Sequence, residues 1–250
     1  MTESRWVLVL AGSGAVLHVL NPSSPAGEWR SLCGRPGMCR AAGYGTYERP
    51  RITLCPSCRA TADAVNVQEA LGLAGPQWPA GLDVETDMLG YSTAVFSPDR
   101  AYRYALTREW DSALPPAVWI MLNPSTADAF KDDQTIRRCI SYSKREGAGG
   151  LVVVNLFALR CTDPNVMKAH PAPVGEMNDQ VIRHVRAMTG WRSLWFVAWG
   201  THGVHLGRDA AVGELLHELQ VKPICLGNLT LNGQPRHPSR LSNDVELLSW

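Results

Sequence analysis

Residues 118–125 read Val118-Trp119-Ile120-Met121-Leu122-Asn123-Pro124-Ser125, an unbroken apolar run that ends in an amide, a proline and a hydroxyl. Three further apolar runs follow, at residues 151–154, 194–198 and 223–226. Continuous apolar runs are typical of strands that are covered on both faces. The pattern therefore predicts a sheet with four parallel strands.

The segments between these runs have the length and pattern of helices. Residues 133–146, 175–188 and 208–219 are amphipathic, and strands that alternate with helices form right-handed βαβ units. Two aromatic and β-branched runs, 91–96 and 102–107, flank the turn sequence Ser97-Pro98-Asp99-Arg100 and indicate a β-hairpin. We expect an α/β domain of three α/β/α layers with a four-stranded, mainly parallel sheet, preceded by this hairpin.

The composition and net charge of the chain exclude few classes of function. The chain has 250 residues and a net charge of +1, so affinity for nucleic acid would have to come from a local patch of basic residues. The apolar residues 6–11 are too few to span a bilayer, and they lack the basic leader of a secretion signal. We expect a cytoplasmic protein with no membrane partner.

Cysteine spacing indicates a metal in the first part of the chain. Cys55-Pro56-Ser57-Cys58 is a CxxC pair, and Cys33, Cys39 and His18 lie upstream. Tetrahedral zinc needs four such ligands, and it replaces the core that a segment of this length struggles to build. Two ligand sets are open: His18 with Cys33, Cys55 and Cys58, or the four cysteines with Cys39 in place of His18.

Breaker-rich sequence divides the chain. Residues 72–81 contain three glycines and two prolines, which suits a linker. We therefore expect a zinc-binding module at 1–70, a linker at 71–90 and the α/β domain at 91–250. Zinc is expected to be structural.

Polar residues stand at the ends of the predicted strands. Asn123 and Ser125 follow the first, Asn155 ends the second, and Trp199-Gly200 follows the third; His237-Pro238-Ser239 comes after the fourth. The carboxyl ends of parallel strands share one edge of a sheet, so these side chains should meet in one crevice. We expect the active site there.

Two resemblances add to this interpretation of the α/β domain. Residues 91–241, with Leu122-Asn123-Pro124-Ser125-Thr126-Ala127-Asp128, closely resemble a bacterial and phage domain family of unknown function. The order of the strand-end motifs is remotely similar to that of the uracil-DNA glycosylase superfamily, with His237-Pro238-Ser239 as the sharpest element. The second resemblance implies the fold of that superfamily.

The cysteine-rich segment carries a third resemblance. His18, then Leu32-Cys33-Gly34-Arg35, then Thr53-Leu54-Cys55-Pro56-Ser57-Cys58 is an arrangement similar to that of small zinc-binding modules in actinobacterial and actinobacteriophage proteins. This resemblance favours the ligand set with His18.

The glycosylase resemblance implies roles for individual residues. Asn123 would position the attacking water, Asn155 would read the base edge, and His237 with Ser239 would supply a donor to the departing base and bind backbone phosphate. An amide cannot act as a full general base, so a nearby carboxylate, Asp128 or Asp133, would have to assist. The remaining candidate substrate-binding residues are Ser125, Thr126, Phe157, Arg160 and Arg240.

The expected function is that of a DNA glycosylase-like enzyme. Its substrate would be a damaged or modified nucleobase, flipped out of single- or double-stranded DNA, and it would cleave the N-glycosidic bond. Two alternatives stay open: a phage-type transferase that remodels a modified base on the same fold, and a non-catalytic, zinc-bearing module that binds nucleic acid or nucleotides.

The zinc prediction can be tested by substitution. We expect Cys55→Ser and Cys58→Ser each to release the metal and loosen about the first 60 residues, because each removes one of four ligands. The second domain should stay folded. Metal analysis with thermal unfolding measures both effects, and one equivalent of zinc retained by both variants would refute the prediction.

Overall fold

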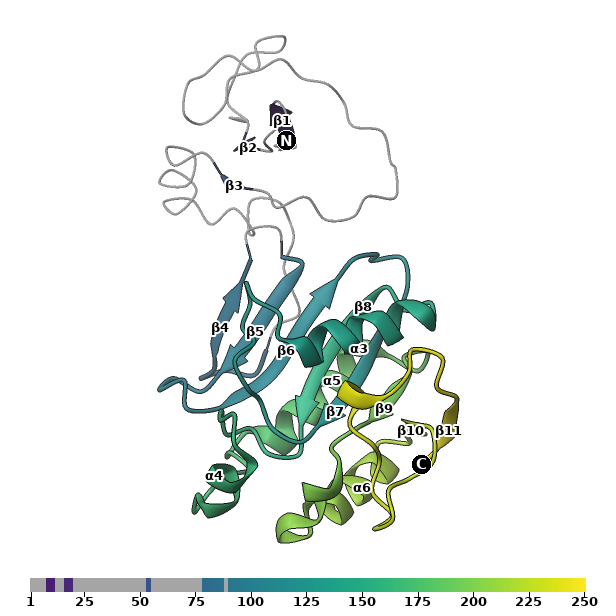
Figure 1. Ribbon diagram of the computed structural model, residues 1–250. Coiled ribbons are helices and arrows are strands. Elements are labelled where there is room, and N and C mark those ends of the chain that lie inside the picture. Colours follow the sequence, from purple (N-terminus) through teal and green to yellow (C-terminus); the bar gives the residue numbers. More distant parts are fainter. Residues whose placement is uncertain (1–7, 12–15, 20–52, 55–77, 88–89) are drawn as a thin grey trace. The chain divides into compact units, whose positions relative to one another are not determined.

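The computed structural model describes residues 8–11, 16–19, 53–54, 78–87 and 90–250 (Figure 1). The chain forms two compact units, Met1–Gly75 and Pro76–Trp250. In the first unit, β1 (Leu8–Ala11) pairs antiparallel with β2 (Val16–Val19), which pairs parallel with β3 (Thr53–Leu54). His18 lies in β2, whereas Cys33, Cys39, Cys55 and Cys58 lie outside the described residues.

The second unit is a mixed α/β domain built on an eight-stranded sheet with the order β11-β10-β9-β7-β8-β6-β5-β4. The strands are β4 (Asp83–Thr86), β5 (Ser92–Phe96), β6 (Arg103–Glu109), β7 (Pro116–Met121), β8 (Gly150–Asn155), β9 (Trp195–Val197), β10 (Ile224–Leu226) and β11 (Leu247–Ser249). The helices are α3 (Gln134–Arg145), α4 (Pro164–Ala169), α5 (Asn178–Thr189) and α6 (Arg208–Glu218), with short 3₁₀ segments η1 (Thr201–Gly207) and η2 (Pro238–Arg240).

The four predicted parallel strands are confirmed as β8, β7, β9 and β10, which are neighbours in the sheet. The prediction of a four-stranded sheet was wrong in number. The hairpin β5–β6 does not merely precede the sheet but joins it, because β6 pairs antiparallel with β8. The edge strands β4 and β11 also pair antiparallel with their neighbours, and β4 lies within the segment expected to be a linker.

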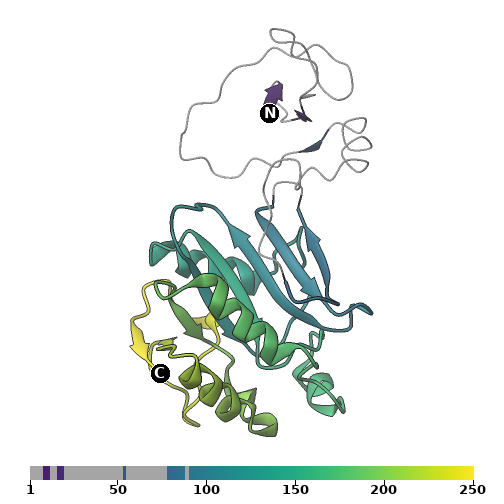
Figure 2. The same ribbon diagram turned by 180° about the vertical axis from the view of Figure 1, so that it is seen from behind.

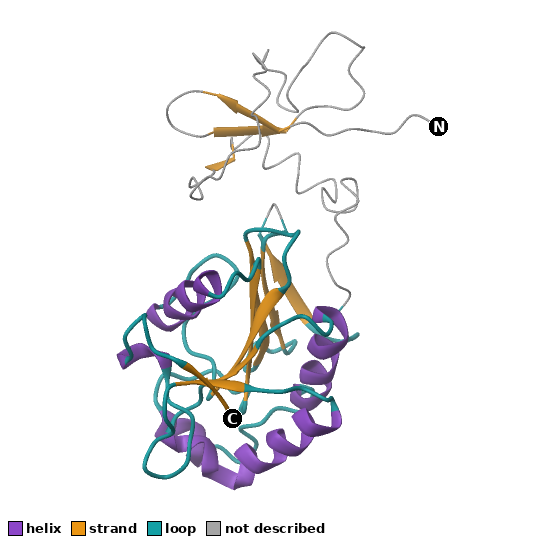
Figure 3. Ribbon diagram, turned by 90° about the vertical axis from the view of Figure 1, so that its right-hand side faces the viewer, coloured by secondary structure: helices purple, strands orange, loops and turns teal. Residues whose placement is uncertain are grey.

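Helices cover both faces of the sheet, as Figures 2 and 3 show. Side chains of α5 and α6 pack on one face, against Val118, Ile120 and Val154. Side chains of α3 pack on the other face, where the Trp119 ring stacks on Phe196 with their centroids 4.2 Å apart. Apolar burial on both faces explains why these strands read as continuous hydrophobic runs.

The route of the chain through the sheet places a crevice beside β7. From β7 the chain passes through α3 to β8 on one side, and it then returns through α5 to β9 on the other side of β7. The strand order reverses at this point, and the connections on the two sides leave a crevice outside the carboxyl ends of the strands.

One buried side chain holds the end of β8. The Nδ2 atom of Asn178, the first residue of α5, donates to the carbonyl oxygens of Asn155 at 2.9 Å and Leu156 at 3.1 Å. Arg208 also donates to the Leu156 carbonyl, at 2.9 Å. These bonds fix the backbone where the strand gives way to the loop.

Among the described residues, no helix combines the length and apolar character that crossing a membrane requires.

We expect Asn178→Ala to lower the free energy of unfolding by about 1–3 kcal/mol, because it removes both hydrogen bonds and leaves buried carbonyl groups without that donor. Urea unfolding measures the change. Asn232→Ala, at an exposed position, is the matched control and should change stability by less than about 0.5 kcal/mol. Equal stability of the two variants would contradict the assigned role.

Candidate functional site

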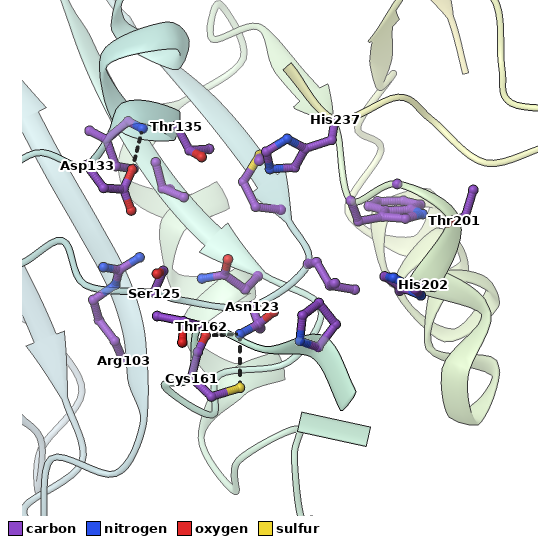
Figure 4. A pocket seen from close by; sticks show the side chains of 18 residues that line it. Arg103, Asn123, Ser125, Asp133, Thr135, Cys161, Thr162, Thr201, His202 and His237 are labelled. Atoms are coloured by element: carbon purple, nitrogen blue, oxygen red, sulfur yellow. Dashed lines mark hydrogen bonds between the residues drawn. The ribbon is translucent and has the colours of Figure 1, made fainter. Parts of the chain in front are cut away.

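A pocket of about 380 Å³ lies at the carboxyl ends of β7, β8 and β9 (Figure 4). Its polar lining comes from segments far apart in the chain: the start of β6, the loop after β7, the start of α3, the end of β8, the loop before α4, the start of η1 and the segment before η2. The lining residues are Arg103, Met121, Leu122, Asn123, Ser125, Asp133, Thr135, Ile136, Val153, Asn155, Cys161, Thr162, Pro164, Trp199, Gly200, Thr201, His202 and His237.

Asn123 joins two loops at the pocket wall. Its Nδ2 atom donates to the carbonyl oxygens of Cys161 at 2.8 Å and Pro124 at 3.1 Å, and it lies 3.3 Å from the Cys161 sulfur. The amide hydrogens are thus engaged with protein acceptors. Its oxygen is the group that can accept a hydrogen bond from water or a ligand.

Asn155 brings a buried amide to the pocket. The residue is only 1% exposed, and its Nδ2 atom has no hydrogen-bond partner in the protein. Buried polar groups are normally paired, and an unpaired one is costly. The hydrogen bond from Asn178 to the Asn155 carbonyl holds the backbone of Asn155 in place. Such a donor suits a ligand with an acceptor.

His237 presents one defined nitrogen. Its Nδ1 atom lies 2.9 Å from the Ser239 hydroxyl and accepts from the Ser239 backbone N–H at 3.3 Å. A nitrogen that accepts carries no proton, so in the neutral ring the proton is on Nε2. Burial lowers the pKa of His237 below its ordinary value, although the Asp133 carboxylate acts in the opposite direction. His237 is therefore a neutral Nε2–H donor near pH 7.

The segment that carries His237 is anchored at both ends. Before it, the Gly200 N–H donates to the Pro235 carbonyl at 2.9 Å, and Gly200 has a φ of +73°, a conformation that favours glycine. After it, the Tyr142 hydroxyl donates to the Ser242 carbonyl at 2.7 Å, and Arg138 donates to the Leu241 carbonyl. Helix α3 thus positions the loop.

Arg103 and Asp133 add opposite charges. Arg103 is the first residue of β6, and because β6 runs antiparallel to β8, its amino end lies at the same edge as the carboxyl ends of the parallel strands. Burial lowers the pKa of Arg103 to about 10, which still leaves it charged near pH 7, and the Asp133 carboxylate favours the charged form. Asp133 caps α3 by accepting from the Ile136 N–H at 2.9 Å. Figure 4 shows both side chains on the same side of the pocket.

The structure brings together five of the candidate residues: Asn123, Ser125, Asp133, Asn155 and His237. Others lie elsewhere. Asp128 accepts from the backbone N–H groups of Phe130 at 2.9 Å and Lys131 at 2.8 Å, so it stabilises a turn outside the pocket lining. Ser239 supports His237 without lining the pocket itself.

Three further candidates do not line the pocket. Phe157 is fully buried in the core and is not available to stack on a base there. Thr126 is exposed, and the Arg160 guanidinium lies 4.9 Å from the centroid of the Phe96 ring and donates to the Arg100 carbonyl. Only the backbone of Arg240 is described, in η2.

The pocket also contains polar residues absent from the candidate set, chiefly Arg103, Thr135, Thr162 and Thr201. Arg103 could have been found only by recognising that the predicted hairpin joins the sheet. The Nδ1 atom of His202 lies 2.9 Å from the Lys168 ammonium. Within the described residues, no cluster of three or more histidine, cysteine, aspartate or glutamate side chains could hold a metal ion.

Comparison with known protein families identifies the family of this chain. A family model described as "Protein of unknown function (DUF1643)" matches residues 103–239, which include β6 through η2 up to Ser239 and hence the pocket-lining residues. No curated protein and no solved structure matches the chain.

The state of His237 can be tested by NMR titration. We expect its ring to titrate below the ordinary pKa of 6.5, and Asp133→Asn to lower that pKa further, because the carboxylate favours the imidazolium. A lowered folded-state pKa makes this histidine's contribution to stability complete above pH 6.5 and reduces it as the pH falls through the folded-state pKa. His217, on α6 and away from this pocket, is the internal control. A His237 pKa at or above 6.5 would contradict the lowered pKa.

Proposed function

Because the chain belongs to the DUF1643 family, whose function is unknown, we propose a function from the pocket: it binds a nucleobase turned out of DNA and hydrolyses the N-glycosidic bond. One observation carries the proposal. Asn123, Asn155 and His237, which stand at or beyond the ends of three different strands, line one pocket at the edge where a doubly wound sheet binds its ligands.

The arrangement of the sheet supports a likeness to the uracil-DNA glycosylase superfamily. Four parallel strands have the order β8-β7-β9-β10, and the strand-end motifs follow β7, β8, β9 and β10 in turn. Helices cover both faces. This is the order of motifs that the resemblance implies, and the pocket collects polar residues from the first, second and fourth motifs.

The size and polarity of the pocket suit a base with part of its sugar. Its volume of about 380 Å³ is within the range of about 300–1,000 Å³ for small-molecule pockets. Met121, Leu122 and Trp199 give apolar contact, and amide, imidazole and carboxylate groups provide orientation. A base reaches such a pocket only after it leaves the stack.

In the proposed reaction, Asp133, Asn123 and His237 each have one role. Water attacks C1′ of the sugar, the C1′–O bond forms and the C1′–N bond to the base breaks. Asp133 accepts a proton from the water, and the Asn123 oxygen orients it. The departing base receives the electron pair of the broken bond, and the neutral His237 Nε2–H stabilises that charge by donating a hydrogen bond.

Asn155 acts on the base itself. Its unpartnered Nδ2 atom can donate to an acceptor on the base edge, and its position is fixed by the bonds of Asn178 to the strand end. A buried donor that a bound base satisfies contributes more than the same bond made in water.

The test is an assay on oligonucleotides that carry uracil, a hydroxymethylated base or a glucosylated base. We expect abasic sites, detected by alkaline cleavage and by the mass of the intact strand. Asn155→Ala and His237→Ala should each lower the rate by about 100-fold or more, since each removes one donor. They should cost little stability, because Asn155 Nδ2 has no partner in the protein and the His237 ring bonds to Ser239 in its own loop.

Asn232→Ala is the control and should cleave at the rate of the unaltered chain. A gain in strand mass would instead assign the chain to base-modifying transferases. Binding without a chemical change on any of these substrates would make it a binding module. Either result would overturn the proposal.

A further inference from the structure

Arg103 differs from the other buried arginines of the described domain. Arg108 pairs with Asp132, with 2.8 Å between guanidinium nitrogen and carboxylate oxygen, and Arg208 pairs with Asp179. Arg186 donates to the carbonyls of Leu219 and Gly190. Arg103 donates to the Ala127 carbonyl, but its Nε atom has no partner and no carboxylate lies within 4.0 Å of it among the described residues.

This incomplete pairing is found at the pocket. Arg103 is 2% exposed and lines the wall, and Figure 4 shows its guanidinium directed toward the pocket between Ser125 and Asp133. The Asp133 and Asp128 carboxylates favour its charged form, whereas Arg108 and Arg160 oppose it. Burying a guanidinium whose N–H groups lack partners costs free energy unless a hydrogen-bond acceptor pairs with them.

The chemistry of arginine determines whether a ligand atom next to Arg103 must donate or accept a hydrogen bond. A guanidinium has five N–H donors and no acceptor, and it stays charged in proteins. The Asn155 amide could offer either its oxygen or its nitrogen to a ligand after rotation, whereas Arg103 can only donate. His237, with its proton on Nε2, is also a donor. At Arg103, the pocket therefore favours an oxygen acceptor on the ligand.

We propose that Arg103 is a specificity-determining residue that selects bases with a keto oxygen at pyrimidine C4 or purine C6 and rejects bases with an amino group at that position. The inference rests on the proposed function, in that the ligand is a nucleobase. A keto oxygen accepts from the guanidinium, as in uracil or hypoxanthine. The amino group of cytosine or adenine would set N–H against N–H and leave the buried donors unsatisfied.

The test measures binding and not cleavage. Isothermal titration calorimetry of the full chain with free uracil, hypoxanthine, cytosine and adenine gives the ratio of keto to amino affinity. We expect the keto bases to bind about tenfold or more tightly, since a hydrogen bond to a charged group is gained. Arg103→Met should reduce that ratio to near one, while Arg192→Met, at an exposed position, should leave it unchanged.

Arg103 also supports the loop through Ala127, so each variant is first checked for folding by circular dichroism. If the methionine variant does not fold, Arg103→Lys serves in its place: it keeps the charge but cannot reproduce the planar set of donors, and the ratio should fall. An unchanged ratio in a folded variant would overturn the proposal.

The remaining outcomes are also decisive. Equal affinity for keto and amino bases, or binding of no base, would overturn the inference. Binding of inorganic phosphate that depends on Arg103, without discrimination among bases, would assign the guanidinium to a phosphate instead. Cleavage of cytosine- and uracil-containing DNA at equal rates would overturn the inference and leave the proposed hydrolysis intact. Selective binding of the keto bases without cleavage would support the inference and contradict the proposed hydrolysis.

Discussion

The position of β7 within the sheet is the constraint on which the site depends. The chain leaves β7 for β8 on one side and returns to β9 on the other, so the loops after these strands diverge around one crevice. Asn123 and Asn155, although 32 residues apart in sequence, are brought to that crevice because β7 and β8 are parallel and in register, with Met121 opposite Asn155. Packing on both faces then holds the strands in place.

The polar framework behind the pocket is what gives its side chains fixed positions. Asn178 holds the end of β8, Asn123 ties the β7 loop to Cys161, and α3 holds the segment that carries His237. Arg108, by its ion pair with Asp132 and its bond to the Asp128 carbonyl, fixes the loop that leads to Asp133. Among the residues that line the pocket, Asn155 and Arg103 are the two that keep buried donors without a partner. That contrast distinguishes the residues that maintain the fold from those suited to a ligand.

The sequence was a good guide where its signals are local. Continuous apolar runs identified β7, β8, β9 and β10, and the parallel sheet then brought Asn123, Asn155 and His237 to one pocket. Short edge strands such as β4, with the sequence Asp-Val-Glu-Thr, carry no apolar run and were missed. Arg103 was missed because its place depends on the pairing of β6 with β8, which is a contact between distant segments. Phe157 shows the converse limit: an aromatic side chain after a strand can belong to the core, and only packing decides which.

The central claim is that this pocket receives a base. The most direct test is a crystal structure of the chain with an oligonucleotide that carries a 2′-fluoro deoxyuridine, whose glycosidic bond resists hydrolysis. The account predicts an extruded uracil in the pocket, with hydrogen bonds from Asn155 and from Nε2 of His237. A uracil that stays stacked in the strand, or one bound on another surface of the domain, would contradict it.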